Sequence, residues 1–258
     1  MSSVTRYSRL YVLAAWLVAG IFFVVMLQRA HNAQRELVCR GIEVVIDYSK
    51  GARFVDENGI KKLIIGKLPN NSVSVPINLV NLQSIEDYLE TNPHIASAEL
   101  YFDYNGKLWA EISQQTPLLR VVNNQNTSYY IGLEGKKMPV STHFTARVPI
   151  ASGNITDNNQ TYGELDTPTV KQLYDLCVYM KDNPFLNSLV EQIYVNADRD
   201  MVLIPKMGKH RIVIGNTDQL DEKFNKLRVF YTQAMPQVGW NTYEVINLKF
   251  ANQIVCSR

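Results

Sequence analysis

The side chains that could carry out metal or acid–base chemistry are scattered along this sequence. The histidines His31, His94, His143 and His210 stand far apart from one another. The chain contains no HExxH, SxxK, GxSxG, GxGxxG or GxxxxGK motif, the common signatures of metal, acyl-transfer, dinucleotide and phosphate sites. A lone histidine is more often exposed or hydrogen-bonded than catalytic. We therefore predict a protein that is not an enzyme, with no catalytic residue, no metal and no cofactor.

The remaining candidates for chemistry are a pair of carboxylates and the cysteines. Asp198 and Asp200 could begin a calcium turn, but the rest of a roughly 12-residue calcium loop is missing, so the pattern favours a hairpin turn. Cys39, Cys177 and Cys256 are odd in number and form no CxxC pair. Neither a disulfide framework nor a zinc site is indicated, and we interpret Cys177 as a core residue and the other two as free thiols.

The composition is that of an ordinary folded protein. The 258 residues include 26 Lys and Arg against 24 Asp and Glu, a formal net charge of +2, and 46% of them are hydrophobic. This balance excludes a disordered charged tail and argues against nucleic acid as a partner. At roughly 100 to 200 residues per domain, the length accommodates one large or two small domains.

The elements that position any site begin with an apolar segment near the N-terminus. Residues 10–27 contain no charge and no amide side chain. As a helix they would be about 27 Å long, close to the ~30 Å hydrocarbon core of a bilayer. Bulky and charged residues follow, instead of an Ala-x-Ala-like cleavage site, so we predict an uncleaved transmembrane helix after a tail of residues 1–9. Arginines flank both sides of the segment, so the positive-inside rule leaves its orientation open.

The segment 41–121 has the pattern strand, helix, helix, strand, strand. Apolar residues alternate with polar ones from Ile42 to Ile46, as in a half-buried strand, and helical spacing follows over 54–65 and from Asn81 onward. Two more alternating stretches flank Asn105 and Gly106, a pair typical of a type I′ hairpin turn. We expect a small α/β domain here.

The segment 122–258 is richer in strands. The turn-rich residues 123–127 mark the boundary between the two domains. Apolar residues at helical spacing predict two helices, over 170–178 and 220–231, among several alternating stretches. The predicted fold class is α+β, with a mixed or antiparallel sheet and two helices in this second domain. The last alternating stretch, 243–250, predicts a strand with one packed face.

Short patterns within this arrangement resemble a known family. The first domain ends with Ile85-Glu86-x-x-Leu89-x-x-Asn92-Pro93-x-Ile95-x-x-Ala98 and Leu108-Trp109-x-x-Ile112-x-Gln114-x-x-Pro117-x-x-Arg120-Val121, similar to a polypeptide-transport-associated (POTRA) domain. The second carries Tyr129-Tyr130-Ile131-x-x-x-Gly135-x-x-Met138-Pro139-x-Ser141, Ala146-Arg147-Val148-Pro149-Ile150 and Tyr243-x-x-Ile246-Asn247-Leu248-Lys249-Phe250-x-x-Gln253-Ile254-Val255-Cys256. Together with the apolar segment, the whole chain resembles the bacterial cell-division family FtsQ, called DivIB in Gram-positive organisms, in its Bacteroidetes-like form.

This resemblance implies a function in cell division. A protein of this family is a non-enzymatic, single-pass component of the divisome, anchored in the inner membrane at the septum. Its N-terminus is cytoplasmic, and its POTRA and β domains, here 41–121 and 122–258, are periplasmic. The β domain binds the coiled-coil partners FtsB and FtsL and thereby helps to control septal peptidoglycan synthesis.

The last strand is our candidate for partner binding. A strand near a chain end tends to lie at a sheet edge, where its free N–H and C=O groups can pair with a strand of another protein. The resemblance places the FtsB contact in this part of the β domain. Alternatively, the strand is interior and merely closes the sheet. The predicted partner-binding residues are Trp240, Tyr243, Val245, Asn247, Lys249 and Phe250.

Two other functions remain open at this point. POTRA domains also occur in outer-membrane biogenesis factors, where they act as chaperones. The other alternative is an anchored periplasmic enzyme with a non-standard site, although the sequence does not cluster a nucleophile with a base.

Overall fold

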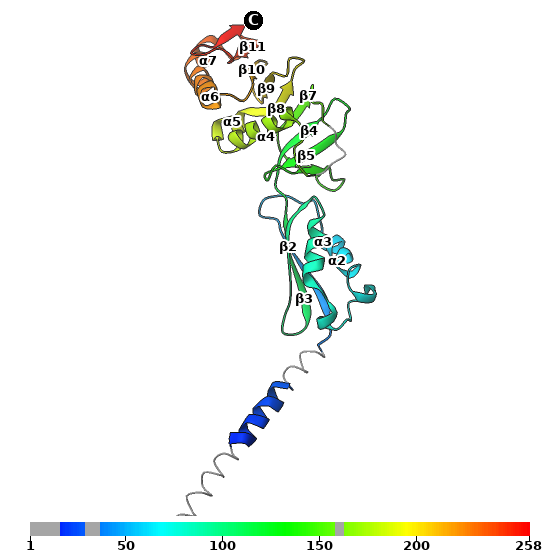
Figure 1. Ribbon diagram of the computed structural model, residues 1–258. Helices are drawn as coiled ribbons and strands as arrows, with labels where there is room; N and C mark the ends of the chain where they lie inside the picture. Colours follow the sequence, from blue (N-terminus) through cyan, green and yellow to red (C-terminus); the bar gives the residue numbers. More distant parts are fainter. Residues whose placement is uncertain (1–15, 29–36, 158–162) are drawn as a thin grey trace, which may run out of the picture. The chain divides into compact units, whose positions relative to one another are not determined.

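The computed structural model describes residues 16–28, 37–157 and 163–258 (Figure 1). The chain divides into two compact units, each described here by itself. Unit 1 includes the chain up to Ile46 together with Asp56–Glu90 and Ser97–Ile112. Unit 2 consists of Asp47–Val55, Thr91–Ala96 and Ser113–Arg258.

The predicted transmembrane segment is only partly described. Residues 16–28 are helical, whereas the predicted span starts at residue 10, so its first six residues and the predicted tail 1–9 lie outside the described part. Within the described ranges, no helix is long and apolar enough to cross a membrane.

The order of elements in unit 1 is the predicted strand, helix, helix, strand, strand. Its three strands form a sheet in the order β1-β3-β2, and two short 3₁₀ turns lie between the helices. Ile60 and Ile64 of one helix and Ile85 and Leu89 of the other are buried, each pair at the i, i+4 spacing of one helix face. The elements are β1 (Gly41–Asp47), α2 (Glu57–Ile65), η1 (Pro69–Asn71), η2 (Ile77–Leu79), α3 (Leu82–Glu90), β2 (Ile95–Phe102) and β3 (Lys107–Gln114).

The turn between β2 and β3 differs from the predicted type I′ turn. Gly106 has a φ of +79°, but Asn105 does not have a positive φ, and a type I′ turn needs both. Asp103 explains the difference, because its side chain accepts hydrogen bonds from the backbone N–H groups of Asn105 at 2.9 Å and Lys107 at 2.8 Å. Such bonds by an aspartate stabilise an ordinary turn, which then needs only one residue of positive φ.

Unit 2 contains a nine-stranded mixed sheet in the order β12-β11-β10-β9-β8-β7-β4-β5-β6. The pairs β4·β7, β7·β8 and β10·β11 are parallel, and the other pairs are antiparallel. The turn between β8 and β9 is the predicted hairpin turn, with Arg199 at a φ of 63°. The strands are β4 (Pro117–Val122), β5 (Ser128–Gly132), β6 (Lys137–Pro139), β7 (Ile150–Gly153), β8 (Val190–Val195), β9 (Met201–Pro205), β10 (Arg211–Gly215), β11 (Val245–Asn247) and β12 (Val255–Ser257).

The helices of unit 2 pack with this sheet in one hydrophobic core. The two predicted helices correspond to α4 (Pro168–Lys181) and α6 (Leu220–Val229), which continues into the π-helix η3 (Phe230–Ala234). The sequence predicts only these two helices, but the short helices α5 (Pro184–Leu189) and α7 (Met235–Val238) are also present. Both are too short for a periodic pattern, although Asn183 before Pro184 is a helix-start signal, and its side chain accepts from the Leu186 N–H at 3.3 Å.

The division into units falls before the predicted boundary. The units separate between Ile112 and Ser113, and β4 already belongs to the nine-stranded sheet. The predicted boundary after residue 121 therefore lies one strand later in the chain than the observed division, because it assigns β4 to the first domain. Only Gln115 and Thr116 separate β3 from β4, so the sequence offers no turn-rich stretch at which to divide the two alternating patterns.

Candidate functional site

The predicted terminal strand lies inside the sheet, so the prediction that it forms the edge is wrong. The strand β11 is only three residues long and lies between β10 and β12. It pairs in parallel with β10, with Arg211 opposite Val245 and Val213 opposite Asn247. The strand ends early because the Asn247 side chain accepts a hydrogen bond from the Lys249 N–H at 3.0 Å, which turns the chain.

The edge of the sheet is instead formed by the last residues of the chain. After a turn in which Asn252 has a φ of 59°, the chain returns as β12, antiparallel to β11. Val255 of this strand is 42% exposed. Within the described residues, β12 has β11 as its only strand neighbour, so its other side offers backbone N–H and C=O groups to solvent.

The opposite edge of the same sheet is occupied. On β6, the backbone N–H of Lys137 donates to the Gly163 carbonyl at 2.8 Å. The Pro139 carbonyl lies 3.0 Å from His94 Nε2, within hydrogen-bonding distance. Other segments of unit 2 therefore occupy hydrogen-bonding groups of the β6 backbone. Of the two edges, β12 is the more accessible.

A groove of about 410 Å³ lies beside β12. One wall comes from α6 and η3, including Val229, Phe230 and Ala234, and the other from Asn252 and Ile254 just before the strand. Lys226 connects α6 with the turn before β12, because its Nζ donates to the Phe250 carbonyl at 2.7 Å. The same Nζ lies 3.4 Å from Glu222 Oε1 within α6. The groove thus adjoins the turn that leads into β12, and Val229, Phe230 and Ile254 give it an apolar part.

The structure brings the predicted partner-binding residues to this end of the sheet, but not onto one face. Trp240 and Phe250 are 40% and 46% exposed, whereas Tyr243, Val245 and Asn247 are half-buried. Lys249 is engaged elsewhere, since its Nζ lies 2.6 Å from Asp200 Oδ2 and its side chain lies over Gly215.

Trp240 lies on a buried pair of polar rings. Its ring centroid is 5.6 Å from that of Tyr231, and the Tyr231 hydroxyl is hydrogen-bonded to His210 Nε2. Burial lowers the pKa of His210, and the neighbouring Trp240 backbone offsets only part of this effect. Burial also raises the pKa of Tyr231. Both rings therefore stay uncharged near neutral pH, and they hold Trp240 at the surface.

The sequence prediction missed β12 itself. The sequence predicts no strand over 255–257, although these residues form the free edge of the sheet. The signal is weak, because three residues are too few to show alternation. The positive φ of Asn252 explains how the chain reverses, and an asparagine between two apolar stretches is a turn signal that points to a returning strand.

Comparison with known families agrees with this architecture. A POTRA-like domain model matches residues 37–113, and the model described as FtsQ/DivIB, C-terminal related, matches residues 116–257, more than half of the chain. The chain belongs to the FtsQ/DivIB family. The predicted resemblance is thereby confirmed, and FtsQ/DivIB membership indicates a protein of the cell-division machinery. No curated protein matches the chain.

In this FtsQ/DivIB chain the two family matches meet where the units separate. The POTRA-like match ends at residue 113 and the C-terminal match begins at residue 116. The whole nine-stranded sheet, with β12 and the groove beside it, lies within the C-terminal match. The candidate site is thus a feature of the FtsQ/DivIB-related part of the chain.

Proposed function

We propose that this protein is a non-enzymatic scaffold of the divisome whose free edge strand β12 pairs with a strand of a partner protein. The partner is an FtsB/FtsL-type coiled-coil division protein, and binding helps to control septal peptidoglycan synthesis. Residues 10–27 anchor the protein in the inner membrane with a cytoplasmic N-terminus, and the rest of the chain lies in the periplasm at the septum.

The observation that carries the proposal is the difference between the two ends of the sheet. At β6 a carbonyl and a ring nitrogen from within the unit engage the backbone, whereas β12 pairs only with β11 among the described residues. An exposed edge strand binds an added strand through main-chain hydrogen bonds, and neighbouring side-chain pockets supply the specificity. The groove beside β12 and the exposed rings of Trp240 and Phe250 are suited to that second part.

A charged residue on the edge tests this binding mode. Natural proteins use lysine on edge strands to prevent pairing, so Val255→Lys should weaken co-purification of the FtsB/FtsL-type partner at least roughly tenfold, which corresponds to ~1.4 kcal/mol. The matched control is Val140→Lys. Val140 directly follows β6 at the other end of the sheet and is 43% exposed, against 42% for Val255. The control should bind as the unmodified protein does.

Equal partner binding by both variants, in folded protein, would contradict the edge-strand proposal. Tyr243→Ala is a second probe, because it removes a half-buried ring beside Phe230 at 6.2 Å without changing charge. Lys249→Glu is less informative, since it would place a carboxylate against Asp200 and disturb the turn as well as the surface.

A further inference from the structure

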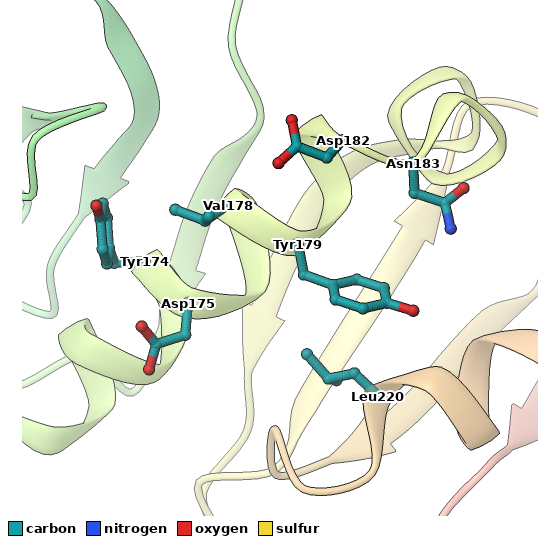
Figure 2. Close-up of a pocket in the computed structure, with 7 residues that line it drawn as sticks. All are labelled: Tyr174, Asp175, Val178, Tyr179, Asp182, Asn183 and Leu220. Atoms are coloured by element: carbon teal, nitrogen blue, oxygen red, sulfur yellow. The ribbon is translucent and has the colours of Figure 1, made fainter.

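A second groove of unit 2 lies between α4 and the start of α6 (Figure 2). It has a volume of about 590 Å³ and shares no lining residue with the groove beside β12. Its apolar surface comes from Tyr174, Val178, Tyr179 and Leu220. Figure 2 shows Tyr179 beside Leu220, with Asp175 of α4 and Asp182, the residue after α4, on either side of Val178.

The aromatic walls are fixed in position before any ligand arrives. The Tyr174 hydroxyl donates to the Leu133 carbonyl at 2.8 Å. The Tyr179 ring stacks on Phe224 with centroids 5.6 Å apart, and its hydroxyl donates to Asp221 Oδ1 at 2.7 Å. Burial and this bond raise the pKa of Tyr179 to about 12, so the hydroxyl stays protonated. Pre-positioned walls lower the entropy cost of binding.

The charge around the groove is negative and only partly compensated. Within the described part of the chain, the Asp175 carboxylate has neither a hydrogen bond nor an ion pair. Asp221, which lies beside the groove, has among the described residues one side-chain partner, the neutral Tyr179 hydroxyl. Asp182 lies 3.2 Å from Lys181, and both side chains of that pair are largely exposed. The two carboxylates that line the groove are therefore those of Asp175, which has no cation, and Asp182, whose pair with Lys181 is exposed.

We propose that this groove receives an arginine or lysine side chain presented by a protein partner. These side chains bury an apolar stem and keep the charged head in contact with carboxylates, which matches apolar walls with acidic residues beside them. The Tyr179 ring adds a surface for cation–π contact. A neutral sugar or an apolar segment would gain nothing from these exposed carboxylates. This surface is separate from β12, and the inference holds whether or not β12 binds a strand.

The test uses the full chain, labelled at its methyl groups and purified in detergent, with a defined probe. The probe is the peptide acetyl-(Ala-Arg)₃-amide, compared with the same peptide in which neutral citrulline replaces arginine. The arginine peptide should produce saturable shifts of the Val178 and Leu220 methyl resonances. The citrulline peptide should bind at least tenfold more weakly.

Two variants localise the charge requirement. Asp175→Asn combined with Asp182→Asn should weaken binding of the arginine peptide at least tenfold. Asp198→Asn, at an exposed carboxylate in the β8–β9 turn, should leave it unchanged. Both changes are isosteric, and unchanged resonances of buried methyl groups show that the fold is intact. The inference is overturned if the arginine peptide causes no shift, if citrulline binds equally, if the double variant binds normally, or if a muramyl disaccharide shifts these resonances at lower concentration.

Discussion

At the scale of single residues, Lys137 is a buried cation of unit 2 that pairs with two carboxylates. Its Nζ lies 3.1 Å from Asp157 Oδ1 and 2.7 Å from Asp166 Oδ2, and the side chains of Lys137 and Asp157 are fully buried. The Tyr129 hydroxyl donates to the other Asp157 oxygen. Removing one partner of such a pair leaves an uncompensated buried charge, which is the costly case for a salt bridge.

Lys137→Ala should therefore lower the free energy of unfolding by about 3 to 5 kcal/mol. The control is Lys136→Ala, because Lys136 is 61% exposed and lies 3.6 Å from Glu134, a surface pair that contributes about 0 to 1 kcal/mol. Urea unfolding of both variants measures the difference. Equal losses for the two variants would show that the buried pair does not stabilise the fold.

The sequence could not predict this buried pair. Lys136 and Lys137 are adjacent, and a lysine is almost never fully buried unless it is paired. Asp157 and Asp166 lie 20 and 29 residues further along the chain, so only the folded structure brings the three charges together. The same holds for Asp221, which reaches Tyr179 from 42 residues away.

At the scale of elements, the β2–β3 turn depends on one glycine. Gly106 has a φ of +79°, and a Cβ at this position would lie 2.8 Å from the Val38 carbonyl oxygen. Gly106→Val should therefore destabilise unit 1 by more than about 1 kcal/mol and leave unit 2 unaffected. Hydrogen exchange of the full chain should show faster exchange in β2 and β3, but not in β4 to β10.

Gly41→Val provides the control for that change. Gly41 also lies in unit 1, but nothing is within 4 Å of a Cβ built there and its φ is not positive. The hydrogen-exchange pattern of the Gly41→Val protein should resemble that of the unmodified protein. Equal acceleration in both units by Gly106→Val would show that the two units unfold together.

The elements that the sequence predicts well are those with a repeating pattern. Helix α4 and strands β2 and β3 each repeat their period several times, so their type follows from the spacing of Leu173, Cys177 and similar residues. β11 and β12 have three residues each, and their neighbours in the sheet are set by packing. That is why alternation over 243–250 suggested one long edge strand where the structure has a short interior strand and a separate edge.

At the scale of the whole molecule, the chain combines an FtsQ/DivIB-related C-terminal part with one exposed edge strand. The C-terminal FtsQ/DivIB-related match covers residues 116–257, and β12 lies at its end. Composition and missing motifs pointed away from catalysis, and the order of strands and helices pointed to a POTRA-like domain, which matches residues 37–113. The resemblance of short motifs could indicate the family. It could not indicate which backbone edge remains free, because that depends on how segments distant in sequence cover the sheet.

The most direct test of the central claim is depletion of this protein from growing cells, with septa and outer-membrane proteins counted in the same cultures. A division scaffold should be needed for septation, so we expect long filaments without septa and normal amounts of outer-membrane proteins. Cells that keep dividing while they lose outer-membrane proteins would contradict the account and favour a POTRA-containing biogenesis factor.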